Sequence, residues 1–230
     1  QHADFTPWPS LRQQSEAYLP PWEPTWAEDH LSRRAFTNRV YWVNRSVAQG
    51  SALPLLIIRR ADNVLVGAIT LDNIRRGPAQ SATCGYWIGQ PFARYGYMRE
   101  ALTAVVHHAF TELDLSRLEA GCLPENTPSR GVLEKCGFKY EGVAQSYLQI
   151  NGRWRNHVLY SALRSDRRGR TDAGGSPVFR PLKPWAEPHP DPPILRPMSR
   201  SACHSRQQSF PNRQRAAFCP ESRHVFRGPP

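Results

Sequence analysis

The stretch from Gly85 to Leu102 reads "GYWIGQPFARYGYMREAL" and joins three patterns. Its first part, together with Thr83 and Cys84 before it, is rich in residues that favour β-strands. Its last part begins a helix, because apolar residues recur at helical spacing at positions 98, 101, 102, 105, 106, 109, 110 and 113. The loop between them opens the helix where backbone N–H groups can bind phosphate. From Gln90 to Leu102 it carries a single glycine, Gly96, so by itself it fits either an anion-binding turn or an ordinary helix start.

The residues on either side of this stretch predict further strands. We expect strands over 55–60 and 64–74, which a tight turn joins, and over 116–123. We also expect a hairpin over 146–163, with Asn151-Gly152 as a type I′ turn.

Two further helices are predicted. One spans about 27–50 and has an apolar face made of Leu31, Phe36, Val40, Val43 and Val47. A short one follows, with Thr127 as N-cap, Pro128 at the first helical position and Gly137 at the C′ position. Helices and strands in this order predict an α/β (α+β) domain over residues 1–165, with a single mixed sheet flanked by helices.

Residues 166–230 differ in composition from the rest of the chain. They carry 12 Lys/Arg against 5 Asp/Glu, and 12 of the 22 prolines, without a sustained apolar period. Such a segment cannot bury enough apolar surface to offset its conformational entropy, so we expect a disordered basic tail. Its charge allows weak contact with RNA, although a solvated tail is the simpler interpretation.

The composition also limits the compartment and the class of protein. No apolar run is long enough to span a membrane, and the first ten residues lack the pattern of a signal peptide. The five cysteines are odd in number and show no CxxC spacing, which argues against a disulfide framework or a zinc site. We therefore expect a cytoplasmic protein without a membrane partner and without a bound metal.

Three segments together resemble the GCN5-related N-acetyltransferases, and most of all the branch that acetylates the N-terminal alanine of a ribosomal protein. They are "GYWIGQPFARYGYMREAL", "NTPSRGVLEKCGF" (126–138) and "YLQINGRWRNHVLYSAL" (147–163). The resemblance covers about residues 5–164 and implies a mostly antiparallel sheet. The family fold normally begins with a strand before its first helix, and here that strand is missing. An incomplete, inactive copy is therefore one alternative.

The resemblance implies acetyl-CoA as co-substrate and assigns residues to it. The family's pyrophosphate loop matches Pro91–Gly96, with departures at its first and fourth positions, the fourth being Arg94. The family's oxyanion donor is a backbone N–H on the preceding strand, in the region Trp87–Gly89. Asn126 matches the residue that contacts the pantetheine arm, and Ser129 is the expected hydrogen-bond donor to the CoA sulfur. The expected cofactor-binding residues are Trp87, Ile88, Gly89, Arg94, Tyr95, Gly96, Tyr97, Met98, Asn126 and Ser129.

Two catalytic groups of other relatives are absent. Gln90 stands where some relatives have a glutamate base, and Leu133 where many have a tyrosine acid. An α-amine needs a base less than lysine does, because roughly a third of it is neutral near pH 7.5 against about 0.1% of a lysine. Water, or Glu119 or Glu125 through water, is the expected base. Trp154, Arg155 and His157 are expected on the acceptor side.

The expected function is acetyl transfer to the N-terminal α-amine of a protein acceptor, with Ser129 and Gln90 as the catalytic positions. Two alternatives remain open from the sequence. One is acetylation of a small-molecule amine such as an antibiotic or a polyamine. The other is a non-catalytic basic protein that binds RNA through residues 166–230.

Overall fold

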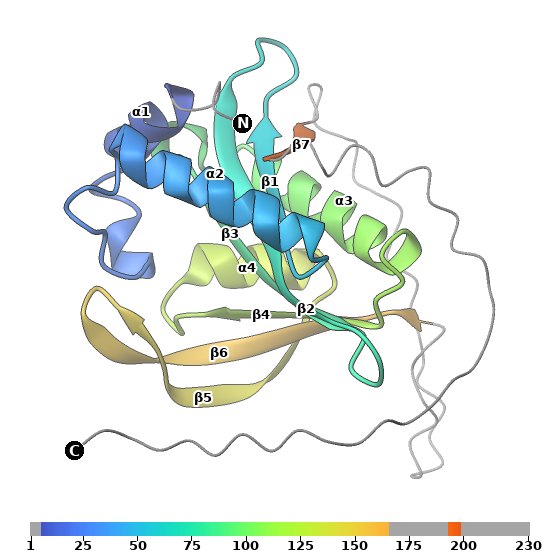
Figure 1. The fold of residues 1–230 in the computed structure, drawn as a ribbon. Helices are drawn as coiled ribbons and strands as arrows, with labels where there is room; N and C mark the ends of the chain where they lie inside the picture. Colours follow the sequence, from blue (N-terminus) through green and yellow to red (C-terminus); the bar gives the residue numbers. More distant parts are fainter. Residues whose placement is uncertain (1–5, 166–192, 199–230) are drawn as a thin grey trace, which may run out of the picture.

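The computed structural model describes residues 6–165 and 193–198 (Figure 1). Its centre is a seven-stranded sheet in the order β5-β6-β4-β3-β2-β1-β7. The strands are β1 (Leu53–Ile58), β2 (Leu65–Arg75), β3 (Ser81–Ile88), β4 (Arg117–Cys122), β5 (Lys139–Ile150), β6 (Arg153–Leu163) and β7 (Ile194–Pro197). All neighbouring pairs are antiparallel except β3 and β4, which are parallel. The predicted mixed, mostly antiparallel sheet is confirmed.

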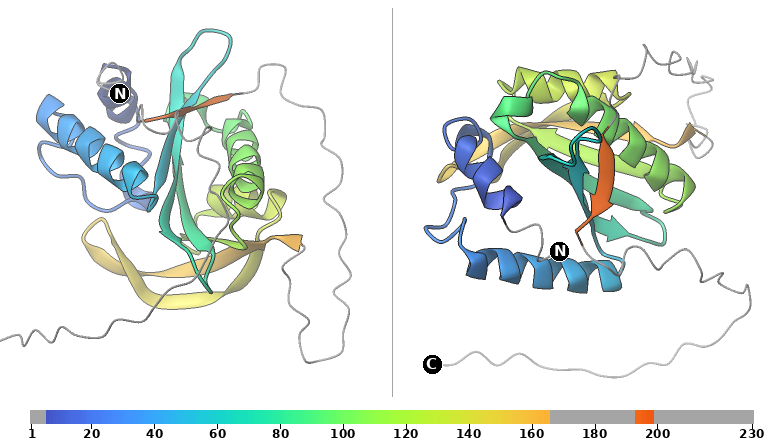
Figure 2. Two further views of the ribbon diagram at one scale, coloured as in Figure 1. Left: turned by 45° about the vertical axis from the view of Figure 1, so that its right-hand side comes forward. Right: turned by 90° about the horizontal axis from the view of Figure 1, so that it is seen from above.

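Helices cover both faces of this sheet (Figures 1 and 2). They are α1 (Pro7–Gln14), α2 (Arg33–Ala48), α3 (Tyr97–Thr111) and α4 (Thr127–Lys135), with short 3₁₀ turns η2 (Pro20–Trp22) and η3 (Gln90–Phe92). Alternate residues of β1 explain the two layers, because side chains of a strand point to opposite faces. Leu56 and Ile58 pack in one core with α1 and α2, whereas Leu55 and Ile57 pack in the larger core with α3.

The strand at the edge of the sheet beside β1 comes from the predicted tail, so the prediction of disorder was wrong for that strand. No strand precedes α1 in the described residues 6–165. Instead β7, from the segment predicted to be disordered, pairs antiparallel with β1 from Ile58↔Ile194 to Leu55↔Pro197 (Figure 2). The side chain of Leu195 packs against the larger core, and Met198 is buried in the smaller one. The remaining residues of the predicted tail, and with them the expected RNA contact, lie outside the described residues.

The predicted turns and caps are confirmed except at the start of α4, which begins at Thr127 and thus has Pro128 as its second residue and not its first. Asn151 and Gly152 have φ of 45° and 75°, the positive values that a type I′ turn requires. Gly137 has φ of 85° after the end of α4, as a C′ glycine should. The N-cap of α4, however, is Asn126 and not Thr127, since the Asn126 side chain accepts the N–H of Ser129. A carboxamide one residue earlier reaches the same orphan N–H group.

Two classes of feature are not found in the described part of the chain. None of its helices is both long and apolar enough to cross a bilayer. Nor do three or more His, Cys, Asp or Glu side chains gather there in a way that suits a metal ion. Cys84, Cys122 and Cys136 are buried free thiols.

Candidate active site

Strands β3 and β4 pair along only part of their length. Their register covers Ser81–Thr83 and Arg117–Glu119, although β3 continues to Ile88 and β4 to Cys122. β3 leads through a turn into α3, and β4 leads into α4. Both helices thus begin at the end of the sheet where the two parallel strands are no longer paired. Such openings at the carboxyl ends of parallel strands, next to helix N-termini, suit ligands and anions in particular.

The end of β3 is held by α1. The N–H of Gly89 donates to the Val66 carbonyl at 2.8 Å, and the N–H of Gln90 donates to Ser15 Oγ at 2.9 Å. Ser15 Oγ in turn donates to the carbonyl of Leu11 at 2.8 Å. A Cβ atom on Gly89 would lie 2.3 Å from Leu11 Cδ1, so only glycine lets α1 come this close. The predicted residues 87–90 therefore sit on a fixed piece of backbone.

The direction of the backbone N–H groups follows from this pairing. The N–H of Gly89 points to β2, and successive N–H groups of a strand point to alternate neighbours. The N–H of Ile88 is therefore directed toward β4, into the opening. The side chain of Gln90 is exposed, and an amide cannot take up a proton at neutral pH.

The turn after β3 has the backbone shape of an anion-binding loop. Arg94 and Gly96 both adopt left-handed conformations, with φ of 70° and 91°. Gly96 is the N-cap of α3, and no side chain of the described residues caps this helix. Tyr97 and Met98 bury their side chains in the core, whereas Arg94 and Tyr95 are exposed. The first turn of α3 is anchored by its side chains, with a cationic side chain beside its N-terminus.

The start of α4 brings a serine toward β3. Asn126 Oδ1 accepts the N–H of Ser129 at 3.1 Å, which fixes the first turn. Ser129 Oγ lies 2.9 Å from the hydroxyl of Tyr86 on β3, and the same hydroxyl donates to the Ser129 carbonyl at 3.3 Å. Ser129 thus joins the two sides of the opening.

The environment of Tyr86 keeps its hydroxyl neutral. Burial raises the pKa of Tyr86 far above its usual value, and the hydrogen bond with Ser129 offsets only part of this effect. Burial also raises the pKa of Cys122. Both groups therefore hold their protons near neutral pH and act as hydrogen-bonding groups rather than as bases.

The two glutamates considered as bases are both ion-paired. Glu119 lies 2.7 Å from Arg117 Nε and 3.3 Å from Arg75, at the closed end of the β3–β4 pair. Glu125 pairs with Arg155. A hydrogen bond from the backbone N–H of Glu125 itself, together with Arg155, lowers the pKa of its carboxyl group. Glu125 is therefore a weaker base than a free carboxylate, and Glu119 is held between two arginines.

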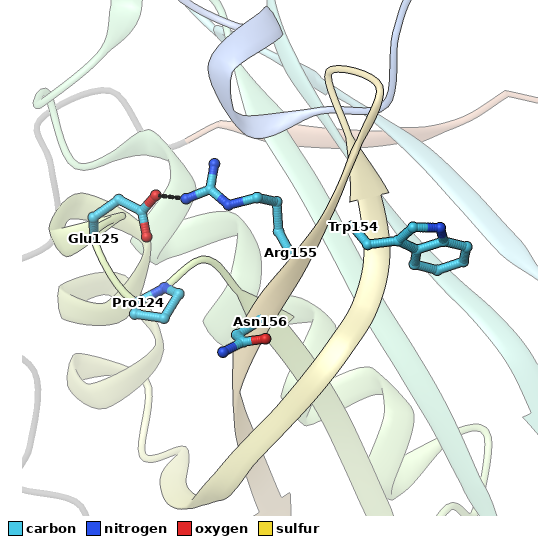
Figure 3. A pocket seen from close by; sticks show the side chains of 5 residues that line it. All are labelled: Pro124, Glu125, Trp154, Arg155 and Asn156. Carbon is cyan, nitrogen blue, oxygen red and sulfur yellow. Dashed lines mark hydrogen bonds and ion pairs between the residues drawn. The ribbon is translucent and has the colours of Figure 1, made fainter.

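A hollow of about 330 Å³ lies between the end of β4 and the β5–β6 hairpin (Figure 3). Its walls are Pro124, Glu125, Trp154, Arg155 and Asn156. Arg155 points toward Glu125, whereas Trp154 points to the other side of the hairpin and is 65% exposed. His157 is buried, and its Nδ1 lies 3.1 Å from the carbonyl of Arg155. Of the three predicted hairpin residues, Arg155 and Trp154 line this hollow.

The segment after α1 closes onto the same hairpin. The carbonyl of Glu23 accepts the N–H of Asn151 at 3.1 Å. The carboxylate of Glu23 is held by the buried Arg12 and by Trp26 Nε1 at 2.8 Å. The Arg12 guanidinium also lies 4.8 Å from the ring of Trp87. This network ties the hairpin tip, α1 and the end of β3 into one wall.

Sequence reasoning missed two residues that the structure brings into this region. Ser15 and Tyr86 make the hydrogen bonds that join α1 and α4 to β3. A signal for Tyr86 was present, because alternation places it on the same face of β3 as the buried Cys84 and opposite Trp87. No sequence signal pointed to Ser15, because its partner Gln90 lies 75 residues away in the chain.

Comparisons with known proteins identify the family of this chain. A family model described as "Acetyltransferase (GNAT) domain" matches residues 1–139. The [ribosomal protein uS5]-alanine N-acetyltransferase of Escherichia coli is 34% identical over 142 residues, covering 62% of this chain and 73% of that protein. The solved RimJ of Mycobacterium smegmatis, in complex with CoA-disulfide, is 31% identical, with a TM-score of 0.68 over 74% of this chain and 81% of that one. A ribosomal-protein-S5-alanine acetyltransferase from Vibrio fischeri has a TM-score of 0.68, 26% identity and coverage of 72% and 91%.

Proposed function

Because this chain belongs to the GNAT family of acetyltransferases, we propose that it transfers an acetyl group from acetyl-CoA to the N-terminal α-amine of a ribosomal protein. The acceptor rests on relatives that carry this activity in their names, above all the uS5-alanine N-acetyltransferase of Escherichia coli. A ribosomal acceptor implies a cytoplasmic location. The observation that carries the proposal is the opening between β3 and β4, with two helix N-termini and Ser129 beside it.

The pyrophosphate of acetyl-CoA would bind at the start of α3. The left-handed backbone at Arg94 and Gly96 turns the chain so that the first N–H groups of the helix are available to anionic oxygens. The helix dipole favours negative charge at the same point. The Arg94 side chain would add a charge-assisted contact. Tyr97 and Met98 support this role by anchoring the turn in the core.

The pantetheine arm would run between β3 and β4 toward Ser129. The Asn126 side chain uses its oxygen for the helix cap, which leaves its NH₂ group to face the arm. The thioester carbonyl would accept a hydrogen bond from the N–H of Ile88, the one directed into the opening. Charge develops on that oxygen in the transition state, so a preorganised donor lowers the barrier. Ser129 would hydrogen-bond the sulfur as the C–S bond breaks.

Deprotonation of the acceptor is left to water in this proposal. Gln90 cannot act as a base, and the carboxylates of Glu119 and Glu125 are ion-paired. An α-amine is already neutral in roughly a third of molecules near pH 7.5, so it needs little help. The arrangement therefore favours an N-terminal amine over a lysine side chain as acceptor.

An acetylation assay with three acceptors tests the proposal. The enzyme is incubated with acetyl-CoA and an alanine-initiated peptide from uS5, a polyamine or an aminoglycoside, and CoA release is followed together with product mass. Acetylation at the peptide α-amine, blocked when that amine is pre-acetylated, is the expected result. Preference for the polyamine or the aminoglycoside would assign a small-molecule acceptor instead. If no CoA is released with any of the three acceptors, the proposed ribosomal acceptor is refuted.

A further inference from the structure

The hydroxyl of the half-buried Tyr86 contacts Ser129 and has no part in the mechanism proposed above. It lies 2.9 Å from Ser129 Oγ and comes from β3, on the opposite side of the opening from α4. The position on α4 itself where many relatives carry a tyrosine is the buried Leu133. A tyrosine hydroxyl thus reaches the region of the sulfur from another element of the fold.

We propose that Tyr86 is a positioning residue for the leaving thiolate, acting through Ser129. Tyr86 donates its proton to Ser129 Oγ, which leaves the Ser129 hydroxyl hydrogen to point into the opening at the CoA sulfur. This inference rests on the proposed role of Ser129. In the reaction the amine nitrogen bonds to the acetyl carbon, the C–S electron pair goes to sulfur, and the proton lost by the amine ends on sulfur through water. Tyr86 and Ser129 keep their own protons.

The geometry favours this direction of the two hydrogen bonds. Tyr86 has two acceptors on Ser129, the hydroxyl at 2.9 Å and the carbonyl at 3.3 Å. The contact with Oγ is the shorter of the two, and donation to Oγ is the arrangement that leaves the Ser129 hydrogen free to meet the sulfur. A hydroxyl that accepts a hydrogen bond is itself a stronger donor, since hydrogen bonds in a chain polarise one another. A tyrosine on a central strand is also less mobile than one on a loop.

A pair of substitutions separates positioning from structure. Tyr86→Phe keeps the ring and removes the hydroxyl, and we expect kcat to fall about three- to tenfold with the KM for the amine acceptor unchanged. The matched control is Tyr41→Phe, which removes a hydroxyl from a side chain of α2 that is 69% exposed. The control should match the parent in kcat and in melting temperature.

A double-substitution cycle tests whether Tyr86 acts through Ser129. If it does, the variant Tyr86→Phe/Ser129→Ala should be no slower than Ser129→Ala alone. Rate losses that multiply in the double variant would overturn the inference. Unchanged kcat in Tyr86→Phe would overturn it as well.

A binding measurement tests the sulfur contact without any acceptor. CoA and desulfo-CoA are titrated into parent, Tyr86→Phe and Ser129→Ala between pH 7 and pH 9.5. Preferential hydrogen bonding to the thiolate lowers the pKa of the bound CoA thiol, so CoA should bind more tightly as the pH rises toward the pKa of the free thiol. We expect this gain for CoA in the parent, a smaller gain in Tyr86→Phe, and none for desulfo-CoA.

Titratable protein groups near Tyr86 could also make binding depend on pH, and desulfo-CoA controls for them. Tyr86 faces Cys84, Cys122 and Cys136, and burial raises the pKa of all four side chains. Arg130 and Glu134, on α4, also act on Cys122, and desulfo-CoA reports any effect that these groups have on binding. Equal pH profiles for CoA in parent and Tyr86→Phe would overturn the inference even if acetylation proceeds. If no acceptor is acetylated but CoA still binds more tightly at higher pH, the proposed acceptor is refuted and the proposed contact with the sulfur is retained.

Discussion

At the scale of single residues, Ser129 and Asn126 divide two tasks that a helix start often combines in one side chain. Asn126 caps α4, and the Ser129 hydroxyl is turned toward Tyr86 on β3. The cap bond uses the backbone N–H of Ser129, which any residue at that position other than proline supplies. A change of the Ser129 side chain therefore leaves the cap intact, and its effect on catalysis is separable from its effect on stability.

We predict that Ser129→Ala lowers kcat tenfold or more with little change in acceptor affinity. The hydroxyl is proposed to meet a sulfur that becomes negative only as the C–S bond breaks, so its loss should appear in kcat. A hydrogen bond to a charged group is worth about 1.5–3 kcal/mol, which corresponds to this range. The control is Ser32→Ala, which removes the side-chain N-cap of α2 and should lose about 1 kcal/mol of stability with kcat unchanged. A lowered melting temperature with normal turnover in Ser129→Ala would assign the serine to structure.

At the scale of elements, the contact between α1 and β3 fixes the strand end that carries the proposed oxyanion donor. α1 reaches the strand only because Gly89 has no side chain, and Leu11 fills the space. The hydrogen bond from Gln90 to Ser15 locks the same junction. The turn that follows starts α3 through two left-handed residues, Arg94 and Gly96. The left-handed conformation costs about 1–2 kcal/mol at Arg94, because it is not a glycine.

We predict that Gly89→Ala destabilises the protein and slows transfer. The new Cβ atom would meet Leu11 Cδ1 at 2.3 Å and Cγ at 2.8 Å, so the Leu11 side chain or α1 itself must shift. Overpacking of this kind costs about 1–3 kcal/mol. Gly85→Ala on the same strand is the control, because a Cβ atom there meets nothing within 4 Å. Equal melting curves for the two variants would mean that α1 does not hold the strand end.

We predict that Gly96→Val weakens acetyl-CoA binding about tenfold or more. Valine is strained at φ of 91° and its branched side chain crowds the backbone proposed to meet phosphate. Gly77→Val in the β2–β3 turn is the matched control, since Gly77 has φ of 65° and equally open surroundings. Both variants should lose similar stability, and only Gly96→Val should lose affinity in a calorimetric titration. Equal acetyl-CoA affinities of Gly96→Val and Gly77→Val would show that this turn does not bind acetyl-CoA.

At the scale of the whole molecule, the sheet is completed by a segment far from it in the chain. β7 pairs with β1, and Leu195 and Met198 each enter one of the two cores. Without this strand, β1 would present an apolar edge with unpaired backbone groups, which favours aggregation. The basic segment after residue 165 is therefore part of the fold over residues 194–198.

We predict that the fragment 1–165 is less stable than the fragment 1–198, by about 2–4 kcal/mol. The loss comes from the burial of Leu195 and Met198 and from the β1–β7 ladder. For a protein of this size that corresponds to a fall in melting temperature of roughly 5–15 °C. The fragment 1–198 should melt like the full chain, which controls for the loss of residues 199–230. Identical melting of all three would show that β7 contributes nothing to stability.

Local chemistry in the sequence determined most of the elements. The apolar period of α3, the Asn151-Gly152 turn and the C′ glycine of α4 each act over a few residues, so the order of amino acids is enough to predict them. The three family segments further predicted the sheet and the turn proposed to bind acetyl-CoA. The Asn126 cap was misassigned to Thr127 because both residues are good caps one position apart. Nothing in the composition distinguished residues 194–198 from the proline-rich sequence around them.

Only the tertiary structure decided which residues distant in the chain pair with one another. Tyr86 meets Ser129 across 43 positions, and Ser15 meets Gln90 across 75. β7 becomes a strand because the open edge of β1 supplies hydrogen-bond partners and two apolar cores, although its own four residues contain a proline and an arginine. Local propensity is a weak force beside such partners, and the partners exist only once the sheet has formed. The sequence by itself determined the elements and the family, whereas the packing of the sheet determined which side chains meet at the proposed site.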